Sequence, residues 1–227
     1  MNELLAPAAQ RSAFGAGRYL RVVNWHNTPA ADAAKLRAEL TWYARRFDPV
    51  LPEHLDRFTD TGEWGLDRPG FVPCFYDAYR NHLTVALPVL EDLGLTGWFL
   101  PPTAALDVPP DEQRDYADAH DIDLVADEPD APWLMTWDDV ARIAERHVVA
   151  AHTAHHASAA SITTAEDAER EVFDPVRRIA DLTGTTPPGF AFLHGTIPEA
   201  GTVAGDAVLA SGVRYAITNT SYVRIAD

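Results

Sequence analysis

The sequence predicts an α/β protein in which parallel strands alternate with helices. Short apolar runs typical of buried strands alternate with longer segments whose apolar residues recur at helical spacing, about six times along the chain. Such alternation favours a parallel sheet with crossover helices. The 227 residues are enough for one larger domain, and the polar residues that could form a site follow predicted strands. A barrel with its site at the carboxyl ends of the strands explains this placement, and a doubly wound open sheet is the competing architecture.

The first half of the chain begins with a predicted N-terminal extension, residues 1–18, followed by a single domain over 19–227. The extension lacks the basic region and apolar core of a signal peptide. The helix that follows Asp77 is expected to end at Gly94, because glycine commonly ends helices. We expect strands at 19–25, 71–76 and 96–100, helices at 33–47 and 51–58 and from after Asp77 to about 93, and a loop at 59–69.

The second half contains an acidic, proline-rich segment, about 107–132, without apolar periodicity. It is predicted as an excursion or lid with a short helix near 112–120. Thr136 and Thr164 precede amphipathic segments and are predicted N-caps. We expect strands at 148–151, 190–192 and 214–218, and helices at 136–146, 164–184 and 203–211.

The charge of the chain limits its partners. The formal net charge is −16, and such a field repels nucleic acids and anionic membranes. No apolar run approaches the ~18 residues of a membrane span. The single cysteine, Cys74, excludes an internal disulfide and a zinc–thiolate cluster, which makes cytoplasmic residence the default expectation. We therefore expect a small-molecule or neutral sugar substrate.

His152 and His156 follow the predicted strand 148–151, four residues apart. Neutral imidazoles at that spacing can bind one divalent metal, although a polar loop rich in histidine is the alternative. Asp77 follows the predicted strand 71–76 and could cap the next helix, bind the metal, or do both. One carboxylate and two histidines suit Zn²⁺ or a similar ion with one coordination position left open.

Three segments resemble the polysaccharide deacetylases that share the NodB homology domain (carbohydrate esterase family 4). Cys74-Phe75-Tyr76-Asp77-Ala78-Tyr79 stands where the family has Thr-Phe-Asp-Asp-Gly-Tyr. His152-Thr153-Ala154-His155-His156 resembles the family motif His-(Ser/Thr)-x-x-His, which is the most specific of the three. Phe190-Ala191-Phe192-Leu193-His194-Gly195 is similar to Phe-Ala-Tyr-Pro-Tyr-Gly. The resemblance covers most of the chain.

The resemblance implies an irregular (β/α) barrel of about seven strands that binds a divalent metal through Asp77, His152 and His156. Zn²⁺ is the first expectation, with Fe, Co, Ni and Mn as alternatives. The family's catalytic base is the first aspartate of the pair, and its place here is taken by Tyr76. An ordinary phenol, with a pKa near ~10, is a poor base at neutral pH.

Other family positions also differ. The late Leu-x-x-His motif that supplies the general acid is not found, and His194 is the first candidate to replace it. Tyr76 and His194 are therefore the candidate catalytic residues. Trp25 and His26 stand where the family has a Tyr-His pair, and with Gly195 they are the candidate substrate-binding residues.

Three functions follow from this pattern. The leading hypothesis is a metal-dependent hydrolase that removes an acyl group from an N-acylated or O-acylated sugar or small metabolite. The second is a catalytically degenerate protein that keeps a metal or a carbohydrate site, because Tyr76 replaces the base. The third is a metalloenzyme with altered chemistry, such as a lyase or oxidative step.

Overall fold

The computed structural model describes residues 7–124 and 132–225, which form a mixed α/β fold with two sheets of mostly parallel strands. In the first sheet the order is β1-β3-β4-β5, all parallel, and β2 pairs alongside β3. Its strands are β1 (Leu20–Trp25), β2 (Asp48–Pro49), β3 (Gly70–Tyr76), β4 (Trp98–Leu100) and β5 (Val148–Val149). The predicted strands at 19–25, 71–76 and 96–100 are confirmed.

The second sheet has the order β6-β7-β8-β9, with β9 antiparallel to β8. Its strands are β6 (Ala151–His152), β7 (Gly189–Ala191), β8 (Tyr215–Ile217) and β9 (Tyr222–Arg224). The predicted strand 148–151 is divided between the two sheets, because Ala150 separates β5 from β6. No strand pairing closes the sheets within residues 7–124 and 132–225, so the barrel itself stays a prediction.

The two sheets nevertheless share an interior. Side chains from both sheets, among them Cys74, Tyr76, Trp98 and Ile217, form one buried cluster. Tyr222 in β9 reaches this cluster, with its hydroxyl 3.4 Å from the Sγ atom of Cys74. Because successive residues of a strand point to opposite faces, the neighbours of these residues face outward and pack under the helices. The strands therefore have one face toward a common interior and one toward the helical layer.

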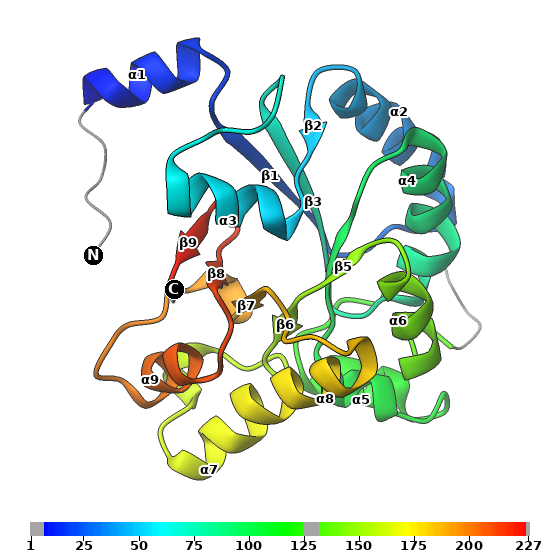
Figure 1. Ribbon diagram of the computed structural model, residues 1–227. Coiled ribbons are helices and arrows are strands. Elements are labelled where there is room, and N and C mark those ends of the chain that lie inside the picture. Colours follow the sequence, from blue (N-terminus) through cyan, green and yellow to red (C-terminus); the bar gives the residue numbers. More distant parts are fainter. Residues whose placement is uncertain (1–6, 125–131, 226–227) are drawn as a thin grey trace.

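Helices cover the outer faces of the strands. Figure 1 shows α2, α4 and α6 along one side and α7, α8 and α9 along another, with α1 standing apart near the N-terminus. Their bounds are α1 (Pro7–Gly15), α2 (Ala33–Ala44), α3 (Pro52–Thr61), α4 (Leu87–Leu93), α5 (Gln113–Ala119), α6 (Trp137–Ala144), α7 (Ala165–Ala168), α8 (Asp174–Thr183) and α9 (Val203–Ala210).

The predicted helix ends are largely confirmed. Thr136 and Thr164 are N-caps that accept from backbone N–H groups of the first turns of α6 and α7. Gly94 and Gly184 end α4 and α8 with left-handed backbone conformations. The segment predicted as one helix after Thr164 is α7, a π-helical turn and α8 in succession. The loop predicted at 59–69 begins later than expected, because α3 continues to Thr61.

Parts of the fold were not predicted from the sequence. These are α1, which lies inside the predicted extension 1–18, and the short strands β2 and β9. The predicted helix of the acidic excursion is present as α5, while residues 125–131 of the excursion lie outside the described residues. Among the helices of the described chain, none has the length and apolarity needed to cross a membrane.

Candidate metal centre

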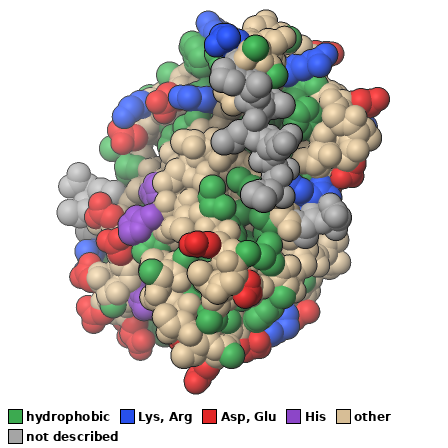
Figure 2. Space-filling model, turned by 90° about the vertical axis from the view of Figure 1, so that its left-hand side faces the viewer, with side chains coloured by type: hydrophobic (Ala, Val, Ile, Leu, Met, Phe, Trp, Pro, Cys, Tyr) green, Lys and Arg blue, Asp and Glu red, His purple; other side chains and the backbone are tan. Residues whose placement is uncertain are grey.

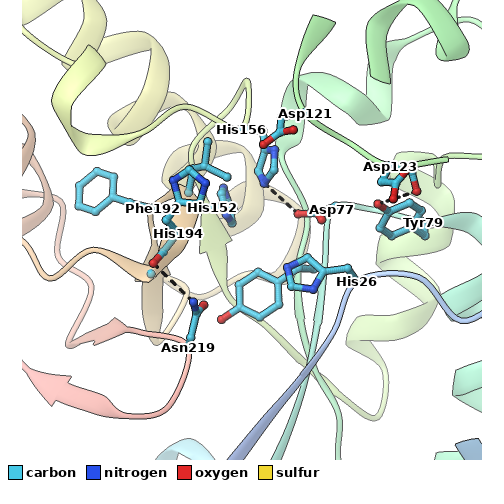
Figure 3. A pocket seen from close by; sticks show the side chains of 13 residues that line it. His26, Asp77, Tyr79, Asp121, Asp123, His152, His156, Phe192, His194 and Asn219 are labelled. Atoms are coloured by element: carbon cyan, nitrogen blue, oxygen red, sulfur yellow. Dashed lines mark hydrogen bonds and ion pairs between the residues drawn. The ribbon is translucent and has the colours of Figure 1, made fainter. Parts of the chain in front are cut away.

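Asp77, His152 and His156 come together at the carboxyl ends of β3 and β6. One ligand atom from each lies within 4.8 Å of the others, and all three side chains are buried. The Nε2 atom of His156 lies 3.1 Å from the Oδ1 atom of Asp77. Figure 3 shows Asp77 facing His156, with His152 beside that imidazole. The three residues predicted as metal ligands therefore converge, and Asp77 does not cap a helix in the described structure.

The backbone around this site is held in a costly conformation. Five non-glycine residues of the described chain have a positive φ, and four of them, Asp77, Asp121, His156 and His194, line one pocket. Such a φ costs a non-glycine residue of order 1–3 kcal/mol and persists only where the surrounding structure enforces it. Strained residues of this kind concentrate at functional sites, so the pocket is the candidate site of the molecule.

Hydrogen bonds determine which nitrogen of His152 is free to bind a metal. The Thr153 hydroxyl donates to the carbonyl of Ala157 at 3.1 Å, and the Nδ1 atom of His152 lies 3.0 Å from that hydroxyl oxygen. Because the hydroxyl already donates its hydrogen to that carbonyl, its oxygen accepts a hydrogen bond from Nδ1–H of His152. The Nε2 atom of the neutral ring then carries a lone pair, as a metal ligand requires.

His156 is oriented in the same way. Its Nδ1 atom lies 2.8 Å from the backbone carbonyl of His120, which can only accept, so Nδ1 carries a proton. The Nε2 atom faces Asp77, and it carries a lone pair once the proton that it shares with that carboxylate is lost. Backbone carbonyls and hydroxyls that fix a histidine tautomer are typical outer partners of metal-binding histidines.

The charges at the site are coupled. Burial lowers the pKa of His152 to about 3, with the neighbouring His156 acting in the same direction, so this ring is neutral at pH 7. Burial alone would raise the pKa of Asp77, but the interaction with His156 outweighs it and holds that pKa below its usual range. Burial alone would lower the pKa of His156, but Asp77 raises it. A divalent cation placed here would replace the His156 proton as the partner of the carboxylate. The donor set therefore fits a metal.

Tyr76 lies next to this centre with its hydroxyl inside the protein. The residue is 4% exposed, and its hydroxyl has no hydrogen-bond partner among the described residues. Burial, with the charges of Cys74 and Asp77, raises the pKa of the phenol well above 10. Tyr76 is therefore protonated at neutral pH, where it can donate a hydrogen bond but cannot accept a proton as a base.

The pocket has a volume of about 370 Å³. The residues that line it include His26, His194 and Gly195, three further site residues predicted from the sequence. The ring of His26 stacks on Tyr76 with centroids 5.5 Å apart. His194 is exposed, and its carbonyl accepts a long hydrogen bond of 3.5 Å from Asn219. Figure 3 places His194 and Asn219 on one side of the pocket and His26 with Asp77 on the other.

Trp25 does not line this pocket, contrary to the expectation from sequence. Its ring stacks on Phe75 at 5.4 Å and lies edge-on to Phe71, on the outward face of the sheet. In the parallel register Trp25 pairs with Phe75, and Phe75 faces the helices. Trp25 thus belongs to the helix–sheet core, and only its neighbour His26 reaches the pocket.

Several residues of the site were missed by sequence reasoning. The pocket is also lined by Tyr79, Asp121, Asp123, Phe192, Leu193 and Asn219. Asp121 and Asp123 come from the acidic segment, which was predicted as an excursion or lid without any site residue. The sequence signal for them is the alternation of acidic and apolar residues in Asp121-Ile122-Asp123. Ile122 is buried, and both aspartates are exposed. The excursion thus contributes one wall of the candidate site.

Comparison with solved structures identifies proteins of the same fold. The deacetylase PplD of Streptococcus pyogenes, in complex with acetate, aligns with a TM-score of 0.61 over 83% of this chain and 77% of that chain, at 12% identity. IcaB from Ammonifex degensii aligns with a TM-score of 0.59 over 88% and 87%, at 15% identity. The BpsB deacetylase domain from Bordetella bronchiseptica aligns with a TM-score of 0.60 over 86% of each chain, at 17% identity.

Comparison of sequences, in contrast, finds no match to this chain. No model of a protein family matches the chain, and no curated protein matches it. At such low identities the structural likeness establishes the fold and leaves the chemistry to the residues of the site. The chain therefore has the α/β fold of the polysaccharide deacetylases, which confirms, at the level of the fold, the resemblance seen in its sequence.

Proposed function

We propose that this protein is a metal-dependent hydrolase that removes an acyl group from an N-acylated or O-acylated sugar or small metabolite. The observation that carries the proposal is the buried set of Asp77, His152 and His156, whose ligand atoms lie within 4.8 Å of one another at strand ends that line a pocket. The hydrogen bonds that leave both Nε2 atoms available support it. The fold that it shares with two solved deacetylases supports it further.

The metal is expected to be Zn²⁺ or another divalent ion that accepts imidazole and carboxylate, such as Fe²⁺, Co²⁺, Ni²⁺ or Mn²⁺. When bound, such an ion lowers the pKa of water and polarises an acyl carbonyl. Asp77, His152 and His156 hold it. The same carboxylate and imidazole also pair with each other, with Nε2 of His156 3.1 Å from Oδ1 of Asp77.

The remaining pocket residues take up proton transfer and binding. Tyr76 is a buried donor without an acceptor in the described protein, so its hydroxyl is assigned to the oxygen of the scissile acyl group. His26 and His194 are the pocket imidazoles outside the ligand set, and they are the candidates for moving protons to and from the reacting groups. Tyr76 is thus assigned the role of a hydrogen-bond donor, and not the role of a base that a phenolate at this position would have.

The proposal is tested by acetate release from N-acetylglucosamine oligomers and 4-nitrophenyl acetate, with each of the divalent metals added in turn. The wild-type protein is expected to release acetate only with metal, and His152→Ala and Asp77→Ala are expected to lower the rate about 100-fold or more. His155→Ala is the matched control, because His155 lies in the same loop but binds Glu171 and does not line the pocket. Full activity in both His152→Ala and Asp77→Ala would contradict the proposal.

The second candidate is a catalytically degenerate protein that binds a metal and a sugar without turning it over. The observation that favours it is the protonated phenol of Tyr76 in the place of the family's base. For this candidate, Tyr76→Asp is expected to create metal-dependent acetate release where the natural protein has none. Measurable turnover by the wild-type protein would exclude it.

A further inference from the structure

One wall of the pocket is negatively charged and unbalanced. Asp121 and Asp123 line the pocket and are exposed, and neither forms an ion pair within residues 7–124 and 132–225. The lining residues include no lysine or arginine. The molecule as a whole carries a net charge of −16, and Figure 2 shows acidic side chains spread over one face, with basic ones mostly in its upper half. A ligand of this pocket therefore meets two exposed carboxylates that no lysine or arginine of the lining neutralises.

The loop that carries these carboxylates is fixed to the metal centre. The carbonyl of His120 accepts from the Nδ1 atom of His156 at 2.8 Å. The carbonyl of Asp123 accepts from the Tyr79 hydroxyl at 3.1 Å and from the Asn27 side chain at 3.2 Å. Ile122, between the two aspartates, is 2% exposed and anchors the loop in the core. The two carboxylates are thus held in place beside the proposed ligands.

The buried hydroxyl of Tyr76 is the second observation that points to a polar ligand in this pocket. Tyr76 is one of the residues that line the pocket, and its hydroxyl is buried without a partner in the described chain. Leaving a buried hydroxyl without a partner is unfavourable, and a ligand oxygen would satisfy it. In Figure 3, Asp123 lies beside Tyr79 on one side, while Asp121 lies close to His156. A ligand that reaches Tyr76 with its acyl oxygen therefore has its other end near a carboxylate wall.

We propose that the substrate carries a free ammonium group next to the acyl group that is removed. This inference rests on the proposed deacylase function and specifies its substrate class as the monoacylated form of a compound with two or more amino groups. Asp121 and Asp123 determine this specificity by binding the ammonium group while Tyr76 binds the acyl oxygen. Each exposed carboxylate is expected to favour the cation by about threefold, and the pair by about tenfold.

Three matched amides test the proposal. N-acetyl-1,4-diaminobutane is cationic, N-butylacetamide is neutral and 4-acetamidobutyrate is anionic, while all three present the same acetamide. Calorimetric binding is measured on the metal-free protein and kcat/KM on the zinc-loaded protein. The variant is Asp121→Asn with Asp123→Asn, and the control is Asp115→Asn with Asp118→Asn, which removes the same charge from exposed positions of α5 outside the pocket.

The expected order is cation, then neutral amide, then anion, in both affinity and kcat/KM. The double variant in the pocket should reduce the preference for the cation over the neutral amide by about tenfold, the control by less than about twofold, and salt should weaken it. Equal binding of the three amides, no binding of the cation at millimolar concentration, or an unchanged preference in the pocket variant would overturn the proposal. If the cation binds selectively but no amide is hydrolysed with any metal, the specificity inference stands and the hydrolase function fails.

Discussion

Thr153 gives the sharpest test of how the metal centre is built. Its hydroxyl accepts a hydrogen bond from the Nδ1 atom of His152 and donates one to the carbonyl of Ala157. Both Thr153 and His152 are buried, so water cannot easily replace the hydroxyl. Thr153→Val keeps the shape of the side chain and removes both hydrogen bonds. The ring of His152 is then free to rotate or to place its proton on the nitrogen that should bind the metal.

The size of the effect follows from these two bonds. The carbonyl of Ala157 still accepts from the backbone N–H of Leu193 at 3.3 Å, so Thr153→Val leaves only the Nδ1 atom of His152 without a partner. A buried donor left without a partner costs about 1–3 kcal/mol, and the free energy of unfolding is expected to fall by that amount. Loss of a partner that orients a metal-binding histidine typically weakens metal affinity about 10- to 100-fold. We therefore expect a reduction of that size for zinc, without any change to the three ligands themselves.

The assay is a competition titration of zinc against a chromophoric chelator, at pH 7.5, with urea unfolding of the metal-free proteins in parallel. Thr153→Ser restores the hydroxyl and should recover most of the zinc affinity, which separates loss of the hydrogen bond from general damage. Zinc binding by Thr153→Val at the wild-type affinity would refute the reasoning, because His152 would then need no fixed tautomer.

Three further predictions concern single residues. Burial lowers the pKa of His82 to about 3, below its unfolded value, so the stability it contributes is present above pH ~6.5 and is lost as the pH falls. The ring of His82 packs against Phe75 and Tyr79, where a phenylalanine ring can take its place. Between pH 7.5 and pH 5, His82→Phe should therefore lose about 2 kcal/mol less of its free energy of unfolding than the wild-type protein, as measured by urea unfolding. An equal loss in both proteins would contradict this. Tyr76→Phe should lower kcat about tenfold or more through loss of a donor, yet leave the shape of the pH–rate profile below pH 9 unchanged. Loss of a limb on which the rate rises with pH would show that Tyr76 is a base after all. His26→Gln and His194→Gln should each lower kcat more than they raise KM, and an unchanged kcat in both would remove the imidazoles from proton transfer.

The sequence predicted the core of the site because its residues follow long or distinctive patterns. The apolar run before Asp77 identified the end of a strand, and the spacing of His152 and His156 is a local signal that does not depend on the rest of the fold. β3, β4 and β5 are parallel, and β6 follows β5 after a single residue, so the carboxyl ends of β3 and β6 lie on the same side of the fold. This is why the three ligands could be predicted together.

What the sequence did not predict depends on register and on distant contacts. The orientation of Trp25 follows from its pairing with Phe75, and no local pattern reveals which of Trp25 and His26 faces the interior. Asp121 and Asp123 lie in a segment without periodicity, whose place is determined by bonds to His156 and Tyr79. β2 and β9 are too short to show an alternating pattern.

The central claim is that Asp77, His152 and His156 hold one divalent cation. Anomalous difference density, measured at the zinc absorption edge on crystals grown with zinc, tests it most directly. We predict a single strong peak at ~2.0–2.2 Å from the Nε2 atoms of both histidines and a carboxylate oxygen of Asp77. A protein that shows no peak there, with Asp77 and His156 paired directly at about 3.1 Å, would contradict the account.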